Sequence, residues 1–321
     1  MLLSVNLQQL LTGEVKLAPC VVALGTFDGV HQGHVAILAA ANKLAHELKA
    51  QPVVCTFDRL PLEVLDPERA PSCLTTHQRR LSLLEAILDK VVVLEFTTAL
   101  ASLSKQQFID EVLVRSLGCM GAVAGFNYTF GKGALGTAAD LRTLGERAGL
   151  RIVIVDPISN NSMPISSTRL RELVKAGEVE RAADGLARPF SLEGTVVAGT
   201  KTGHALGFPT ANLLCDSNLI LPADGVYITY ASDISENKPL GAALTAVSAR
   251  PTFHGTKQTV ESHILNYEGQ LYGQRIAISF YQRLRNIVHF STPAELKAQI
   301  SLDIKAAHHY WLQRTAKEPF T

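Results

Sequence analysis

The chain has 321 residues, of which 47% are hydrophobic and 18% charged, so it is long enough for two globular domains. Lys and Arg number 30 and Asp and Glu 29, a balance that argues against broad electrostatic attraction to nucleic acid or to an anionic membrane. Five scattered cysteines without a C-x-x-C pair are typical of reduced thiols. Because we see neither a signal-peptide pattern nor a membrane-length apolar run, we expect a cytoplasmic protein.

The first half of the chain alternates short apolar strands with helical stretches. We expect strands at residues 20–25, 52–57, 91–96, 121–126 and 151–155. We expect helices between them, at residues 34–50, 79–88, 105–117 and 138–149. Buried strands that alternate with helices predict a parallel α/β sheet, whose functional residues lie at the carboxyl ends of the strands.

The pattern of apolar and turn residues changes in the second half of the chain, from about residues 184–190. We expect strands, separated by turn residues, at 192–199, 225–232, 241–249, 261–267 and 274–281. Closely spaced strands of this kind predict a small antiparallel β-barrel, and residues 292–316 predict a closing helix. We therefore place one domain at residues 1–186 and a second at 187–321.

The stretch GTFDGVHQGH, residues 25–34, directly follows the first of these strands. His31 and His34 are three residues apart, so they share one face of the first turn if a helix starts near His31. Backbone N–H groups and the helix dipole make that turn a natural phosphate site, and nearby glycines let a ligand approach closely. The H-x-x-H spacing has no further metal-ligand pattern, so it favours a metal site less than a phosphate site. A turn with two incidental histidines remains the alternative.

Three ordered stretches carry a family resemblance: FDGVHQGH, GFNYTFGKGALG at 125–136 and ISSTRLRELV at 165–174. They resemble the adenylyltransferase half of the bacterial bifunctional riboflavin kinase/FAD synthetases, which implies a Rossmann-like nucleotidyltransferase domain. The implied reaction is attack of an FMN phosphate oxygen on the α-phosphorus of ATP, with release of pyrophosphate.

The same resemblance implies catalytic roles for His31, His34 and Arg169. It implies ATP or flavin contacts at Gly25, Phe27, Asp28, Gly29, Gly33, Asn127, Ser166, Ser167 and Thr168. Without it, the three hydroxyl residues would be read as helix caps and Asn127 as a turn residue. The family's usual Pro-His after TF is DRLP here, at residues 58–61, which leaves details of ligand contact open.

Two stretches of the second half contain residues that suggest phosphate binding. GTVVAGTKTG, residues 194–203, is not a Walker A loop, because Thr200 separates Gly199 from Lys201. In LGFPTANL, residues 206–213, Thr210 and Asn212 lie two apart in an extended segment and can face the same way. Their neutral oxygens suit Mg²⁺ held mainly by substrate phosphates, with a proline turn as the alternative.

GFPTAN resembles the hallmark of the riboflavin kinase barrel, and VESHIL at 260–265 and LYGQR at 271–275 follow in family order. The resemblance thus extends over nearly the whole chain. It implies that Glu261 is the catalytic base for the ribityl hydroxyl, that Thr210 and Asn212 are the metal ligands, and that ATP or flavin contacts Gly207, Pro209 and Arg285.

The barrel half departs from the family pattern at several positions. Ser248 replaces a glycine, Asn266 replaces an acid, residues 286–289 lack an expected acid, and His204 replaces a basic residue. The main expectation is an enzyme that uses ATP and Mg²⁺ to convert riboflavin to FMN and FMN to FAD. The alternatives are an FMN adenylyltransferase whose weakened or inactive barrel only binds flavin, and a flavin-sensing protein. We expect no nucleic-acid or membrane partner and leave the oligomeric state open.

Overall fold

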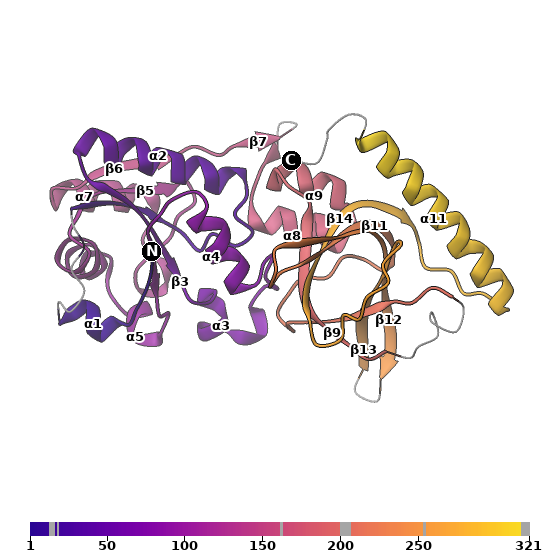
Figure 1. Ribbon diagram of the computed structural model, residues 1–321. Helices are drawn as coiled ribbons and strands as arrows, with labels where there is room; N and C mark the ends of the chain where they lie inside the picture. Colours follow the sequence, from indigo (N-terminus) through magenta and orange to yellow (C-terminus); the bar gives the residue numbers. More distant parts are fainter. Residues whose placement is uncertain (13–16, 18, 161–162, 200–206, 253–254, 316–321) are drawn as a thin grey trace. The chain divides into compact units, whose positions relative to one another are not determined.

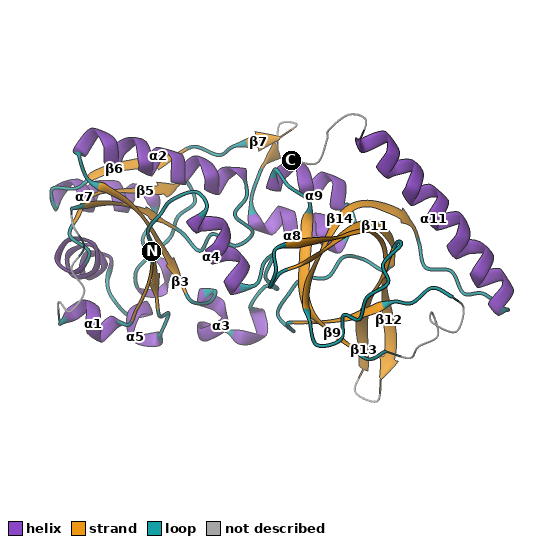
Figure 2. Ribbon diagram, in the orientation of Figure 1, coloured by secondary structure: helices purple, strands orange, loops and turns teal. Residues whose placement is uncertain are grey.

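The structure is a computed structural model that describes residues 1–12, 17, 19–160, 163–199, 207–252 and 255–315. It divides into two compact units, Met1–Ser167 and Thr168–Thr321. Figure 1 traces the elements along the chain and Figure 2 separates helices from strands. No helix among the described residues combines the length and the apolar character needed to span a membrane.

The first unit contains a parallel sheet covered on both faces. Its sheet strands are β1 (Leu2–Val5), β2 (Cys20–Leu24), β3 (Gln51–Phe57), β4 (Val91–Leu94), β5 (Cys119–Gly125) and β6 (Arg151–Val155). Its helices are α1 (Leu7–Leu11), α2 (Gln32–Leu48), α3 (Pro61–Leu65), α4 (His77–Glu85), α5 (Thr98–Ala101), α6 (Lys105–Gln107) and α7 (Ala138–Arg147). Short 3-10 turns lie at η1 (Pro67–Arg69) and η3 (Lys132–Ala134), a π-helix at η2 (Phe108–Ser116), and a two-stranded ribbon at β7 (Ser159–Asn160) and β8 (Met163–Pro164).

The sheet order is β1-β4-β3-β2-β5-β6, and all neighbouring strands are parallel. Strand β2 is buried along its whole length, since Val22 and Leu24 pack into one core and Val21 and Ala23 into the other. This explains its unbroken apolar sequence. The chain runs from β2 to β3 on one side, while β5 lies on the other side, so the strand order reverses at β2. Such a reversal is where open α/β sheets bind ligands.

The expected parallel α/β domain is therefore present, with small differences in its elements. Strand β1 was not predicted, because its four residues show no clear alternation. The expected helix at 105–117 is a short α-helix followed by the wider turns of η2. Helix α2 has the expected apolar face, with Leu38, Ala41 and Leu44 buried against the sheet.

The second unit begins with two helices and continues as a closed six-stranded barrel. Its elements are α8 (Ser167–Lys175, which starts at the division), α9 (Val179–Leu186), β9 (Phe190–Val197), β10 (Ala211–Cys215), β11 (Gly225–Asp233), β12 (Lys238–Thr252), β13 (Gly255–Ile264), β14 (Arg275–Arg285) and α11 (Pro293–Thr315). The barrel order is β10-β13-β12-β11-β14-β9, antiparallel throughout, which confirms the predicted barrel and closing helix. Helix α11 packs Trp311 against Tyr230 and Tyr281.

Candidate functional site

The turn that follows β2 has an unusual backbone. Phe27, Gly29 and Val30 all have positive φ angles, of 53°, 81° and 40°. The N–H of Val30 closes the turn by donating to the carbonyl of Phe27 at 3.1 Å. A β-branched residue such as Val30 rarely adopts this conformation, and such strain concentrates at functional sites. The turn places the start of helix α2 at the point where the strand order reverses.

The two histidines of this turn stack on each other. His31 is the N-cap of α2, and its Nδ1 accepts a hydrogen bond from the N–H of His34 at 3.3 Å. The two rings are 3.6 Å apart and 17° from parallel. In a neutral imidazole whose Nδ1 accepts, the proton is carried by Nε2, so that nitrogen of His31 is a donor. Gly33 permits this packing, since a Cβ there would lie 3.1 Å from Cε1 of His31.

Phe27 and Asp28 stabilise the turn through buried contacts. Phe27 is fully buried, and its ring meets that of His34 edge to face at 5.1 Å. Asp28 is 2% exposed, and its carboxylate accepts from the N–H groups of Leu74 and Thr75. Ligand binding at Phe27 and Asp28 stays a prediction, but the contacts of their side chains are those of supports.

The other predicted residues of the first site come from two segments. Asn127 lies two residues after the end of β5, the neighbour of β2, so it lies at the same edge of the sheet as the histidine turn. The hydroxyl of Ser167 donates to the carbonyl of Asp28 at 2.9 Å, which ties the segment containing Ser166 to the turn. Thr168 and Arg169 belong to the second unit.

Sequence reasoning missed one buried cation at this edge. Arg80 of α4 is 4% exposed, and its Nη2 donates to the carbonyl of Phe57, the last residue of β3, at 2.7 Å. Burial lowers the pKa of Arg80, and attraction by Asp28 opposes that shift. Nothing in the local sequence distinguishes Arg80 from an ordinary surface arginine on a helix, so no signal could have identified it.

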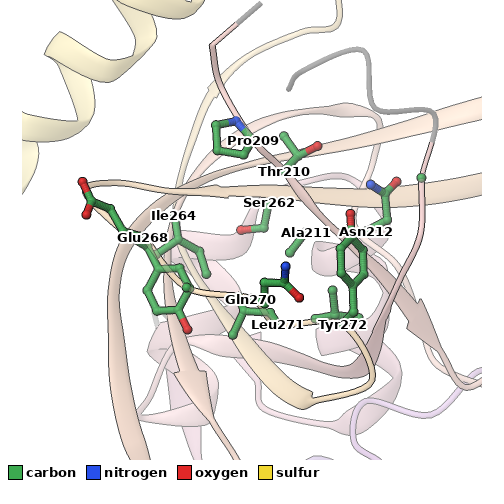
Figure 3. A pocket seen from close by; sticks show the side chains of 14 residues that line it. Pro209, Thr210, Ala211, Asn212, Ser262, Ile264, Glu268, Gln270, Leu271 and Tyr272 are labelled. Atoms are coloured by element: carbon green, nitrogen blue, oxygen red, sulfur yellow. The ribbon is translucent and has the colours of Figure 1, made fainter. Parts of the chain in front are cut away.

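The second unit contains a pocket of about 550 Å³. Figure 3 shows Thr210 and Asn212 on one side of it and Gln270, Leu271 and Tyr272 on the other. Pro209 and Glu268 also line it, so three residues predicted from GFPTAN surround one cavity. Gly207 has a φ of 89°, the left-handed region that favours glycine, and it does not line this pocket.

Strand register places the proposed catalytic and metal-binding side chains together. Asn212 pairs with Glu261 across β10 and β13, so both side chains project from the same face. The Nδ1–H of His263 donates to the carbonyl of Pro209 at 2.8 Å and holds the start of this segment. His263 was missed as a site residue, although its spacing of two from Glu261 on a strand was a usable signal.

Gly199 was also missed, because it falls in the stretch rejected as a Walker A loop. A Cβ on Gly199 would collide with the carboxamide of Asn212, so only glycine leaves that side chain its place. Gly199 lines the same pocket. Thr200, Lys201 and His204 lie outside the described residues.

Arg285 is engaged by a structural partner. Its guanidinium donates to both carboxylate oxygens of Asp303 on α11, with the shortest contact at 2.7 Å. Asp303 is 4% exposed, and Gln299 donates to it as well. A ligand contact at Arg285 therefore stays a prediction, while a carboxylate from α11 neutralises this arginine in a chain that lacks an acid at 286–289.

Two departures from the family pattern have local explanations. Ser248 lies on the face of β12 opposite to the fully buried Thr245 and Val247, and its hydroxyl lies 3.2 Å from that of Thr259. Asn266 has a φ of 56°, a conformation that asparagine tolerates better than most residues. Neither substitution fills the pocket.

Comparisons with known proteins match both units. The family model for FAD synthetase covers residues 14–169 and that for riboflavin kinase covers residues 186–311. The bifunctional riboflavin kinase/FMN adenylyltransferase of Pseudomonas fluorescens is 33% identical over 93% of this chain and 96% of its own length. The enzyme of the same description from Escherichia coli (strain K12) is 32% identical over 91% of this chain and 93% of its own.

A crystal structure described as a macrolide-efflux protein from Streptococcus pneumoniae has the same fold. It superimposes with a TM-score of 0.85 and 29% sequence identity, covering 95% of this chain and 99% of that one. Efflux is named for that protein alone. With matching models on both units and full-length relatives above 30% identity, the chain belongs to the bifunctional riboflavin kinase/FMN adenylyltransferase family, enzymes that phosphorylate riboflavin to FMN and adenylylate FMN to FAD.

Proposed function

We propose that the histidine turn of the first unit carries out adenylyl transfer. The observation that supports this best is the stacked His31–His34 pair at the amino end of α2, at the reversal of strand order. The phosphate of FMN is already a nucleophile, so the reaction needs positioning and charge neutralisation more than a base. The Nε2–H of His31 would donate to phosphate oxygens as charge builds up, with His34 beside it. Arg169 and Asn127 would complete the binding of ATP and FMN.

We propose that the barrel pocket carries out phosphoryl transfer to riboflavin. Glu261 would accept the proton of the ribityl 5′-hydroxyl while that oxygen attacks the γ-phosphorus of ATP and ADP leaves. Glu261 does not itself line the cavity, but strand register pairs it with Asn212, which does, and this pairing supports the assignment. His263 would position the segment through Pro209 rather than touch substrate.

Thr210 and Asn212 fit a Mg²⁺ ion that arrives with ATP. Among the described residues no group of three His, Cys, Asp or Glu could hold a metal alone, and these two side chains supply neutral oxygens. Such a donor set suits an ion whose remaining ligands are phosphates and water. When bound, the ion would neutralise phosphate charge. Gly199 keeps the carboxamide of Asn212 in place for it.

We further propose a functional boundary at residues 186 and 187 and a cytoplasmic location. The family model for riboflavin kinase begins at residue 186, which supports this boundary, whereas the compact units divide after Ser167 and helix α9 packs on β14 through the contact of Glu180 with the N–H of Arg283. The location is supported by five free cysteines, including Cys20 and Cys119, whose sulfur atoms lie 3.8 Å apart without a bond.

A product assay tests the division of labour. The purified chain is given riboflavin, ATP and Mg²⁺, and the flavins are separated over time. We expect FMN to appear first and FAD to follow. FAD formed from added FMN, with no FMN formed from riboflavin, would instead select an inactive barrel. Flavin binding without any turnover of ATP would contradict both assignments and favour the sensor.

A further inference from the structure

A third histidine of the first unit lies at the same edge of the sheet as the histidine turn. His77 is the first residue of α4 and is exposed. Its Nδ1 lies 2.9 Å from Nη2 of Arg80, the buried cation that also donates to the carbonyl of Phe57 at 2.7 Å. Phe57 is the last residue of β3, and β3 neighbours β2, so Arg80 connects His77 to the carboxyl end of a central strand.

Hydrogen bonds also join the surroundings of His77 to the histidine turn from two sides. The hydroxyl of Thr56, on β3, donates to the carbonyl of Thr26 at 3.2 Å. On the other side, the carboxylate of Asp28 accepts from the N–H of Leu74 at 3.0 Å, and Leu74 belongs to the segment that leads into α4. His77 therefore belongs to the part of the unit that surrounds the proposed adenylyl-transfer site.

Arg80 determines which nitrogen of His77 carries the proton. A guanidinium has only donors, so the Nδ1 of His77 accepts from it, and the neutral ring carries its proton on Nε2. Burial lowers the pKa of His77 and Arg80 lowers it further, while Asp58 opposes the shift and Arg59 adds to it. The amino end of α4 also disfavours a charged ring. Among the described residues, no hydrogen bond uses the Nε2–H, so the exposed ring has a fixed donor available.

The groups around His77 favour a phosphate as its acceptor. Its charged neighbours are Arg59, Arg80 and Asp58, and the exposed Arg59 pairs with Asp58 at 2.7 Å. A flat heterocycle binds best between apolar or aromatic walls, which these side chains do not provide. A phosphate oxygen suits an N–H donor that is held beside guanidinium groups. Adenylyl transfer brings two sources of such oxygens to this edge, the phosphates of ATP and that of FMN.

We propose that His77 is a binding residue for adenylyl transfer, whose Nε2–H donates to a phosphate oxygen of FMN or of ATP and whose ring is oriented by Arg80. The proposal rests on the adenylyltransferase function proposed above. It supplies an imidazole beside residues 58–61, where this chain departs from the family pattern. The contact is made before and during transfer alike, so it affects substrate binding and leaves the chemical step unchanged.

His77→Leu tests the donor. A hydrogen bond to a charged acceptor corresponds to about a ten- to hundredfold change in KM. We expect that increase for FMN or for ATP in FAD formation, with kcat unchanged, and the substrate affected identifies the phosphate. The rate of FMN formation from riboflavin should not change, which would confine the effect to the first unit. Unchanged KM values for both substrates would overturn the proposal.

Two further variants separate the donor from the bulk of the ring. Glutamine is close to histidine in length and has an N–H donor at its tip, so His77→Gln should keep a KM near that of wild type. His46→Leu is the matched control, because it removes an exposed histidine from the last turn of α2, at the opposite end of that helix from the histidine turn. It should change neither KM. Equal losses in His77→Gln and His77→Leu would overturn the role of the donor.

Nitrogen NMR of the histidine rings tests the proton position directly. The signal that disappears in His77→Gln belongs to His77, and we expect it to show a proton on Nε2 and none on Nδ1 at neutral pH. A proton on Nδ1 would contradict the orientation by Arg80.

A binding measurement distinguishes this proposal from the adenylyltransferase assignment. If the wild-type chain forms no FAD from FMN and ATP, that assignment fails, and binding of FMN alone and of ATP alone is then measured by calorimetry. Weaker binding of one of them to His77→Leu than to wild type would still support the donor. Equal binding of both would remove it.

Discussion

The histidine turn and the barrel pocket organise their side chains in different ways. The turn depends on its backbone, since Phe27, Gly29 and Val30 have positive φ and Asp28 is buried under them. The pocket depends on strand register, which sends Glu261 and Ser262 to opposite faces of one strand. A site built from main-chain conformation tolerates few substitutions, whereas a site built from register allows single groups to be changed. Each reaction also shows whether the effect of a substitution is confined to one unit.

Glu261→Gln should have the largest effect on catalysis. Loss of a general base typically costs about 10²–10⁴-fold in rate, so we expect that loss in FMN formation from riboflavin. The rate of FAD formation from added FMN should not change, because that reaction belongs to the histidine turn. An unaltered kinase rate would show that Glu261 is not the base, and that its pairing with Asn212 does not indicate that role.

Arg285→Met should have the largest effect on stability. It leaves the buried carboxylate of Asp303 unpaired, which costs about 3–5 kcal/mol of unfolding free energy. Urea unfolding followed by fluorescence of Trp311, the chain's single tryptophan, reports on the second unit. The double variant Arg285→Met/Asp303→Leu should recover most of that stability. A recovered fold that stays inactive as a kinase would instead support the predicted ligand contact of Arg285.

His31→Asn and His31→Ala separate capping from catalysis in the turn. Asparagine is a good N-cap and alanine is a poor one, so only alanine should lose about 1 kcal/mol of stability. Both should lose about 10²–10³-fold in FAD formation, the effect of removing one donor to developing charge. The kinase rate is the control. If the His31→Asn variant kept its rate of FAD formation, the role of His31 would be that of a helix cap alone.

Gly199→Ala should have a moderate effect confined to the barrel. The new methyl group would displace the carboxamide of Asn212, and such overpacking costs about 1–3 kcal/mol. We expect riboflavin phosphorylation to use ATP less efficiently, while the rate of FAD formation stays unchanged. Adding Asn212→Ala should remove the strain, so the second substitution should cost less activity in the Gly199→Ala background than in wild type. Additive losses would contradict a shared cause.

The smallest effect concerns acid stability of the first unit. A hydrogen bond from Lys105 lowers the pKa of Asp140 from 3.8 to about 2. Because the folded pKa is the lower one, this carboxylate stabilises the fold above pH 3.8, and the contribution disappears as the pH falls toward 2. Asp140→Asn should flatten the pH dependence of unfolding between these values in the first unit. A slope identical to that of wild type would contradict the assignment.

Most of the fold could be predicted because its strongest signals are local. The apolar strand at 20–24 and the helical period from Ile37 to Leu44 need no distant partner to be recognised. The left-handed conformation of Val30 could not be predicted, since valine by itself favours extended backbone.

The site residues that the sequence could not predict depend on contacts between segments that are distant in the chain. The pairing of Arg285 with Asp303 joins residues 18 apart on a strand and a helix, and only the fold brings them together. The need for glycine at position 199 comes from the side chain of Asn212 on a separate segment, which no sequence pattern indicates. His263 is the exception, because alternation along a strand already placed it on the face of Glu261.

The closed barrel and the open sheet have different consequences during synthesis. The first unit emerges from the ribosome first, and among the described strands its sheet ends at β1 and β6, of four and five residues. Edge strands are templates for association with other chains, and short ones limit that hazard. The barrel closes through the pairing of β9 with β10 and has no such edge. Aggregation of nascent chains should therefore respond to substitutions in β1 and β6, and charged residues there are the place to increase yield.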